Sequence, residues 1–72
     1  MKEIKRMIEL VDMYLQYLSP FYTKRIEYWT KQKRYAKTIL DNGWEPSPNQ
    51  LSIIKSNIDK LDQLIITEIN KK

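Results

Sequence analysis

The sequence contains no histidine and no cysteine, and it has only one glycine and three prolines among its 72 residues. Without imidazole and thiol groups the chain has no histidine base, no cysteine nucleophile and no disulfide bond. It also lacks the nitrogen and sulfur ligands that zinc, copper and iron prefer. A single glycine excludes a glycine-rich phosphate-binding loop. We therefore expect no enzymatic activity and no cofactor.

Long apolar segments are missing as well. A secretory leader has an apolar run after its basic start, but the first ten residues are interrupted by charged side chains, namely Lys2, Glu3, Lys5, Arg6 and Glu9. No uncharged apolar stretch approaches the roughly 20 residues that cross a bilayer. The sequence thus predicts a cytoplasmic protein without a membrane partner.

The acidic residues do not form a cation site. Glu9 with Asp12 and Asp59 with Asp62 have the spacing of neighbours on one helix face. A hard divalent cation needs several further oxygen ligands, and no second cluster supplies them. Lysine or arginine also lies near each pair, so we expect ordinary solvated charges and no bound metal.

The remaining composition is typical of one small globular domain that spans residues 1–72. Hydrophobic residues make up 42% of the chain and charged residues 31%, a balance that excludes both a membrane protein and a typical disordered chain. Thirteen basic against nine acidic side chains give a net charge of +4. This modest excess favours negatively charged partners.

Apolar side chains recur at helical spacing from about residue 2 to residue 18. Intervals of three and four residues separate them, which predicts an amphipathic helix with one apolar face. That face consists of Ile4, Met7, Val11, Tyr14 and Leu18.

A second helix is predicted over residues 20–42. The Ser19 hydroxyl can accept a hydrogen bond from a free amide at a helix start, and the proline that follows it is favoured at the first helical position. Gly43 suits the left-handed conformation that ends many helices. On a helical wheel, Tyr22 and Trp29 point toward the core.

A third helix is predicted over residues 48–70. Ser47 and Gln50 have the spacing of a capping box, with a proline in the first turn. The apolar side chains again recur at intervals of three and four residues. They are Leu51, Ile54, Ile58, Leu61 and Ile65.

These elements predict an all-α fold in which the second and third helices form an antiparallel hairpin, because the turn between them is short. If residues at equal distances from that turn lie side by side, Lys33 is opposite Asp59 or Asp62. Helices are expected nearly throughout, since the single glycine and the three prolines near two breaks leave almost nothing else to interrupt regular structure.

The first helix allows two architectures. The chain can reverse at Ser19 and close a three-helix bundle, or the first helix can continue through Pro20 into the second as one kinked rod. The extended form leaves the apolar face of the first helix uncovered, and a homodimer would then bury it. We favour this self-associating form.

Basic and aromatic side chains alternate along the second helix and continue into its flanking turns. Together they can attract a negatively charged partner and anchor it, since aromatic residues are common at binding hot spots. A solvated basic flank around an ordinary core is the alternative interpretation. The candidate partner-binding residues are Tyr17, Phe21, Lys24, Tyr28, Lys31, Arg34, Tyr35, Lys37 and Trp44.

The sequence therefore predicts a small helical interaction protein, such as an inhibitor, adaptor or assembly factor, that binds another protein through this surface. Its size fits an origin in a phage or a mobile element. The alternative is a nucleic-acid-binding accessory protein in which the same basic flank contacts phosphates. For Trp44 there is also a purely structural interpretation, a contact with Leu40 at the helix end.

Overall fold

A computed structural model describes residues 2–71, which form three α-helices and no strand. The helices are α1 (Lys2–Tyr17), α2 (Thr23–Asn42) and α3 (Pro48–Asn70). The molecule measures 38 × 19 × 16 Å along its principal axes. The prediction of an all-α fold with three helices is confirmed.

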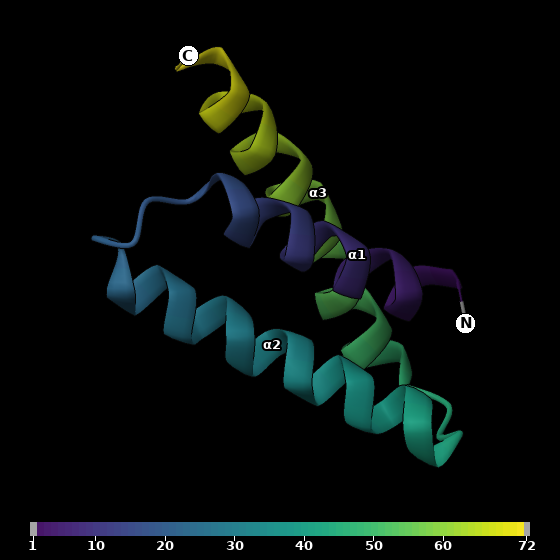
Figure 1. The fold of residues 1–72 in the computed structure, drawn as a ribbon. Coiled ribbons are helices and arrows are strands. Elements are labelled where there is room, and N and C mark those ends of the chain that lie inside the picture. The colour runs from purple at the N-terminus through teal and green to yellow at the C-terminus, as the bar shows by residue number, and fades with distance from the viewer. Residues whose placement is uncertain (1, 72) are drawn as a thin grey trace.

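α1 is the central element of the fold. It lies across both other helices, while α2 and α3 diverge from the turn that joins them (Figure 1). α1 packs against α2 and against α3, but within the described residues no Cα atom of α2 comes within 8 Å of one in α3. The two later helices run antiparallel, as expected, and they share a core mainly because α1 lies against both.

The apolar face of α1 is wide enough to serve two neighbours. Leu10 is buried at one edge of this face, and Ile8 packs against the core from the other edge. Of the twelve buried apolar side chains, half come from α1 and the residue that follows it, which explains its central place. These six are Ile4, Met7, Leu10, Val11, Tyr14 and Leu18.

The chain reverses direction between α1 and α2. The Ser19 carbonyl accepts the N–H of Tyr22 at 3.0 Å, and the Ser19 hydroxyl accepts the N–H of Phe21 at 3.4 Å. Pro20 occupies the second position of this turn, where its fixed φ is favourable. α2 consequently begins at Thr23, three residues later than expected, because Ser19 stabilises a turn rather than a helix start.

This reversal places the apolar face of α1 inside the monomer. Ile4, Val11 and Tyr14 each have 0% exposure. The extended rod is therefore not the observed architecture. Because α1 is already covered in the monomer, its apolar face gives no reason to expect a homodimer.

Gly43 ends α2 as expected. Its φ of 65° lies in the left-handed region, which costs glycine little because it has no Cβ atom. The N–H groups of Gly43 and Trp44 donate to the carbonyls of Leu40 and Ile39 at 3.2 and 3.1 Å. These two bonds form a Schellman motif, which satisfies carbonyl groups that the helix end leaves free.

The capping box at the start of α3 is also confirmed. The Ser47 hydroxyl accepts the backbone N–H of Gln50 at 3.2 Å, and the Gln50 side chain accepts the backbone N–H of Ser47 at 3.0 Å. Two free amides of the helix start are satisfied in this way. The short segment between Gly43 and Ser47 thus has a defined geometry at both of its ends.

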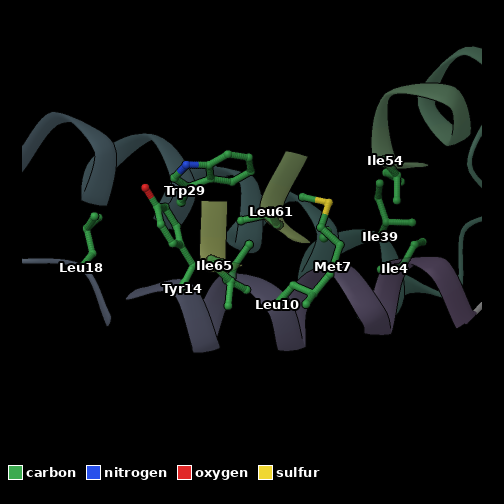
Figure 2. Packing of buried hydrophobic residues seen from close by; sticks show 12 residues of the cluster. Ile4, Met7, Leu10, Tyr14, Leu18, Trp29, Ile39, Ile54, Leu61 and Ile65 are labelled. Carbon is green, nitrogen blue, oxygen red and sulfur yellow. The ribbon is translucent and has the colours of Figure 1, made fainter. Parts of the chain in front are cut away.

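Two aromatic residues join α1 to α2 in the core. The rings of Tyr14 and Trp29 meet edge to face, with centroids 6.3 Å apart, and Figure 2 shows both beside Leu61 and Ile65 in the cluster. Edge-to-face pairs stabilise a core beyond their buried area. The hydroxyl of Tyr14, however, is buried and has no hydrogen-bond partner among the described residues.

Replacing Tyr14 by phenylalanine is expected to raise the free energy of unfolding by about 1 kcal/mol, since an unpaired buried hydroxyl is costly. The ring contact with Trp29 is retained in this variant. Urea unfolding followed by circular dichroism measures the change. A loss of stability would show that the hydroxyl has a partner in solution.

The ion pairs differ from the sequence-based expectation. Lys33 does not face Asp59 or Asp62, because α1 lies next to α2 at this level. Its Nζ atom instead lies 2.5 Å from Asp12 Oδ1 of α1. Asp62 pairs with Arg6 of α1 at 3.9 Å. Both pairs are largely exposed and contribute little stability, but both connect α1 to a neighbouring helix.

Candidate functional site

The divergence of α2 and α3 leaves a groove between them, with α1 beneath it. Its volume is about 440 Å³, within the usual range of ligand and peptide sites. We call it the α2–α3 groove. It is lined by Met7, Lys31, Gln32, Tyr35, Gln50, Ile53, Ile54 and Asn57.

Three apolar side chains form the water-excluding part of this groove. Met7 points from α1 toward the other two helices (Figure 2), and Ile54 is buried beside it in the same core cluster. Ile53 is 59% exposed, so it presents apolar surface at the groove. A partner that covered Ile53 would gain hydrophobic free energy without rearranging the core.

Tyr35 and Gln50 connect the two walls at the end near the turn. Gln50 donates a hydrogen bond from Nε2 to the Tyr35 hydroxyl, while its Oε1 accepts from the capping residue of α3. The Tyr35 hydroxyl keeps its own proton and can donate it to a ligand. The capping box therefore also fixes a polar group at the rim of the groove.

Asn57 is the one buried polar side chain among the described residues, with 9% exposure. It lines the groove, and its amide makes no hydrogen bond with the described residues. Its amide atoms are not closed off from solvent, since the Tyr14 hydroxyl is the one fully buried, unpaired side-chain polar group among the described residues. The amide therefore reaches the cavity, where water or a ligand can hydrogen-bond to it. Sequence reasoning missed it. The available signal was an asparagine at helical spacing from Ile54 and Leu61, inside an apolar face.

α2 carries the charge excess of the protein. It has six basic and two acidic side chains, and this difference equals the net charge of +4 of the whole chain. α1 has equal numbers of each sign, and α3 has three acidic against two basic side chains. Of the three helices, only α2 has a net positive charge, and it contributes Lys31 to the groove.

Four of the predicted site residues surround a shallow depression on α2, beside the groove. They are Lys24, Tyr28, Lys31 and Arg34. Glu27 lies among them, so the surface is basic but not uniformly so. Lys31 lines both this depression and the α2–α3 groove. It connects the predicted basic surface to the cavity.

The remaining predicted residues lie elsewhere. Lys37 is exposed on α2 outside both cavities. Tyr17 and Phe21 lie at the corner between α1 and α2, where Phe21 is 91% exposed. Trp44 is 58% exposed in the turn between α2 and α3. Because α2 is about 30 Å long, the corner and the turn cannot belong to one small contact with the groove.

Tyr22 was predicted to point toward the core, but it is 40% exposed. It lies at the start of α2, where the chain leaves the turn, and the Arg25 guanidinium is positioned 4.9 Å from its ring centroid. This geometry is that of an exposed cation–π contact. Trp29, predicted in the same way, is buried at 3% exposure.

Comparison of the chain with models of known protein families, with curated proteins and with solved structures found no match. Over residues 2–71, no helix has the length and apolar character needed to cross a membrane. The same residues contain no group of three or more acidic side chains placed to hold a metal ion. The function has to be inferred from the groove and its basic wall.

Proposed function

We propose that this chain is a non-enzymatic interaction protein that binds another protein through the aromatic and basic surface of α2 and the adjoining groove. The observation that supports the proposal is the position of Lys31. It lies at once in an open, partly apolar groove and in a basic surface with exposed Tyr28. Apolar contact and charge are the usual components of a protein interface.

Exposed aromatic side chains support the same proposal. Tyr28 and Tyr35 are each 47% exposed, and both are held by contacts within the fold. The rings of Tyr28 and Trp29 pack edge to face with their centroids 5.0 Å apart, while Tyr35 is hydrogen-bonded to Gln50. Side chains that are already ordered lose little entropy on binding.

The test is affinity purification of the tagged protein from its source cells, with nuclease treatment and mass spectrometry. The wild-type protein is expected to retain a protein partner after nuclease treatment. The double variant Lys31→Glu with Arg34→Glu is expected to lose about tenfold or more of that partner, because it reverses two charges beside the groove. Circular dichroism should show unchanged helicity.

The matched control is Lys55→Glu with Lys60→Glu, which makes the same charge change at exposed positions of α3. It is expected to retain the partner. Equal binding by both double variants would contradict the proposed surface. If the wild-type protein retained no protein partner at all, the proposed function would be wrong.

A nucleic-acid-binding accessory function is the second candidate. It is supported by the concentration of the whole charge excess on α2, next to exposed Tyr28. Phosphate contacts predict affinity that falls steeply with salt. If no DNA or RNA binding is detected at about 50 mM salt, where such contacts are strong, this candidate is excluded.

A further inference from the structure

We propose that the α2–α3 groove binds one acidic amphipathic helix of the partner protein, with the Asn57 amide hydrogen-bonded to a side chain of that helix. This inference rests on the proposed function and specifies the chemistry of its partner. It is carried by the shape of the groove, the charge of its wall and the unpaired amide beneath it.

The groove has the dimensions of a contact with two helical turns. On α3 its lining extends from Gln50 to Asn57, and on α2 from Lys31 to Tyr35. At 1.5 Å per residue the α3 wall is roughly 10 Å long. A helix that binds such a groove uses apolar side chains at positions i, i+3 or i+4, and i+7. Ile53, the exposed apolar side chain of the lining, would contact that apolar face.

The charges of the lining favour a ligand helix that carries acidic residues beside its apolar face. Among the described residues, Lys31 is the only charged one that lines the groove, and the neighbouring depression adds Lys24 and Arg34 against a single acidic residue, Glu27. The other polar groups of the lining are the amides of Gln32, Gln50 and Asn57 and the Tyr35 hydroxyl, all of which can donate hydrogen bonds. Glutamate or aspartate beside the apolar face of the ligand would accept them.

The same charges argue against a second copy of this chain as the ligand. Two copies that met groove to groove would bring together two α2 helices, each with a net charge of +4. Like charges across an interface are unfavourable. α1, whose apolar face would otherwise need a partner, is already covered within the monomer.

Asn57 is the feature of the groove that favours a specific ligand rather than general apolar contact. Asn57 lies within the apolar face of α3, where a leucine would bury more apolar surface, and its amide instead reaches the groove without a partner inside the protein. A carboxylate or amide of the bound helix would pair with it. The amide would then favour one position of the ligand along the groove, as a single buried asparagine does in coiled coils.

The experiment is selection from a displayed library of helix-forming peptides with randomised surface positions, using the intact protein as bait. Enriched peptides are expected to share an apolar i, i+3/i+4, i+7 pattern with aspartate or glutamate beside it. The best peptide is then titrated against the protein by fluorescence anisotropy. Enrichment of basic sequences, of sequences without helical periodicity, or of nothing at all would overturn the inference.

The variants locate the binding site. Ile53→Glu is expected to weaken binding of the selected peptide about tenfold or more, whereas Ile66→Glu, at an isoleucine of similar exposure on α3 outside the groove, should change it less than about twofold. Both residues are more than half exposed, so both variants should fold. Equal effects at the two positions would overturn the inference.

Asn57→Asp tests the polar contact. It nearly preserves the shape of the side chain and replaces a donor with a negative charge, so an acidic peptide is expected to bind at least about tenfold more weakly. Unchanged binding, or tighter binding, would show that this amide does not face the ligand. Urea unfolding verifies that the variant remains folded.

Different results would contradict the proposed function and the proposed ligand of the groove. If the natural partner is lost in Lys31→Glu with Arg34→Glu but retained in Ile53→Glu, the function stands and the groove does not hold the ligand. Sedimentation equilibrium of the protein alone provides the remaining check. A dimer that Ile53→Glu dissociates would identify a second copy as the occupant and overturn the inference.

Discussion

Replacing Trp29 by alanine is expected to lower the free energy of unfolding by about 3–5 kcal/mol. Its side chain is 3% exposed and contacts Tyr14 of α1 edge to face. α2 has only two other buried residues, Ala36 and Ile39, so its N-terminal half is held to the core by Trp29 and the partly buried Ile26. A domain of this length has a total stability of roughly 4–11 kcal/mol. The variant should therefore lose a large part of the total stability.

Tyr28→Ala is the matched control, because it removes the neighbouring aromatic ring from the outer side of α2. Tyr28 is 47% exposed, and its loss is expected to cost about 1 kcal/mol or less, mainly the ring contact with Trp29. Urea unfolding followed by circular dichroism compares both variants with the wild type. Similar losses in the two variants would mean that Trp29 is not the core contact between α1 and α2.

Removal of residues 1–18 is expected to abolish cooperative unfolding of the remaining chain. In the intact protein, α2 and α3 have no close backbone approach and share a core mainly through α1. Without it, Trp29 would lose its contact with Tyr14, and helices in proteins owe most of their stability to such tertiary packing. A fragment that begins at Ser19 should show low helicity and a broad, non-cooperative urea response.

A synthetic peptide of residues 1–18 is expected to restore the helicity of this fragment. The same peptide with Val11→Asp should fail, because Val11 has 0% exposure and the aspartate would be a buried, unpaired charge. The peptide with Met13→Asp is the control, since Met13 is 43% exposed. Cooperative unfolding of the fragment alone would contradict the central place of α1.

Local features of the fold were predictable from sequence because neighbouring residues determine them. The three apolar periodicities correspond to the three helices, and the signals at Gly43 and Ser47 give the expected helix end and helix start. At Ser19 the same type of signal was ambiguous. A serine before a proline can begin a helix or a turn, and hydrogen bonds to Tyr22 and Phe21 stabilise the turn.

The arrangement of the helices depends on contacts that a helical wheel does not contain. A short turn predicted direct pairing of α2 with α3, but the wide apolar face of α1 lies against both and separates them. Lys33 consequently pairs with Asp12 of α1 rather than with α3. The groove is a product of this separation, so the sequence did not indicate it.

The candidate site was predictable only in part. The exposed basic and aromatic residues of α2 stood out because charge and aromatic character are visible in the sequence. The α3 wall was missed, because Ile53 resembled an ordinary flank of a core face and Asn57 an exception within it. Only the three-dimensional arrangement shows that both line a cavity shared with Lys31.

The most direct test of the account is a titration of the intact, ¹⁵N-labelled protein with the isolated binding segment of its partner, followed by nuclear magnetic resonance. We expect the largest shifts at the backbone amides of Lys31 and Ile53 and at the side-chain amide of Asn57. The backbone amides of Met13 and Ile66, which lie outside the groove, should remain unchanged. Shifts confined to Met13 and Ile66, with the Asn57 side chain unaffected, would contradict it.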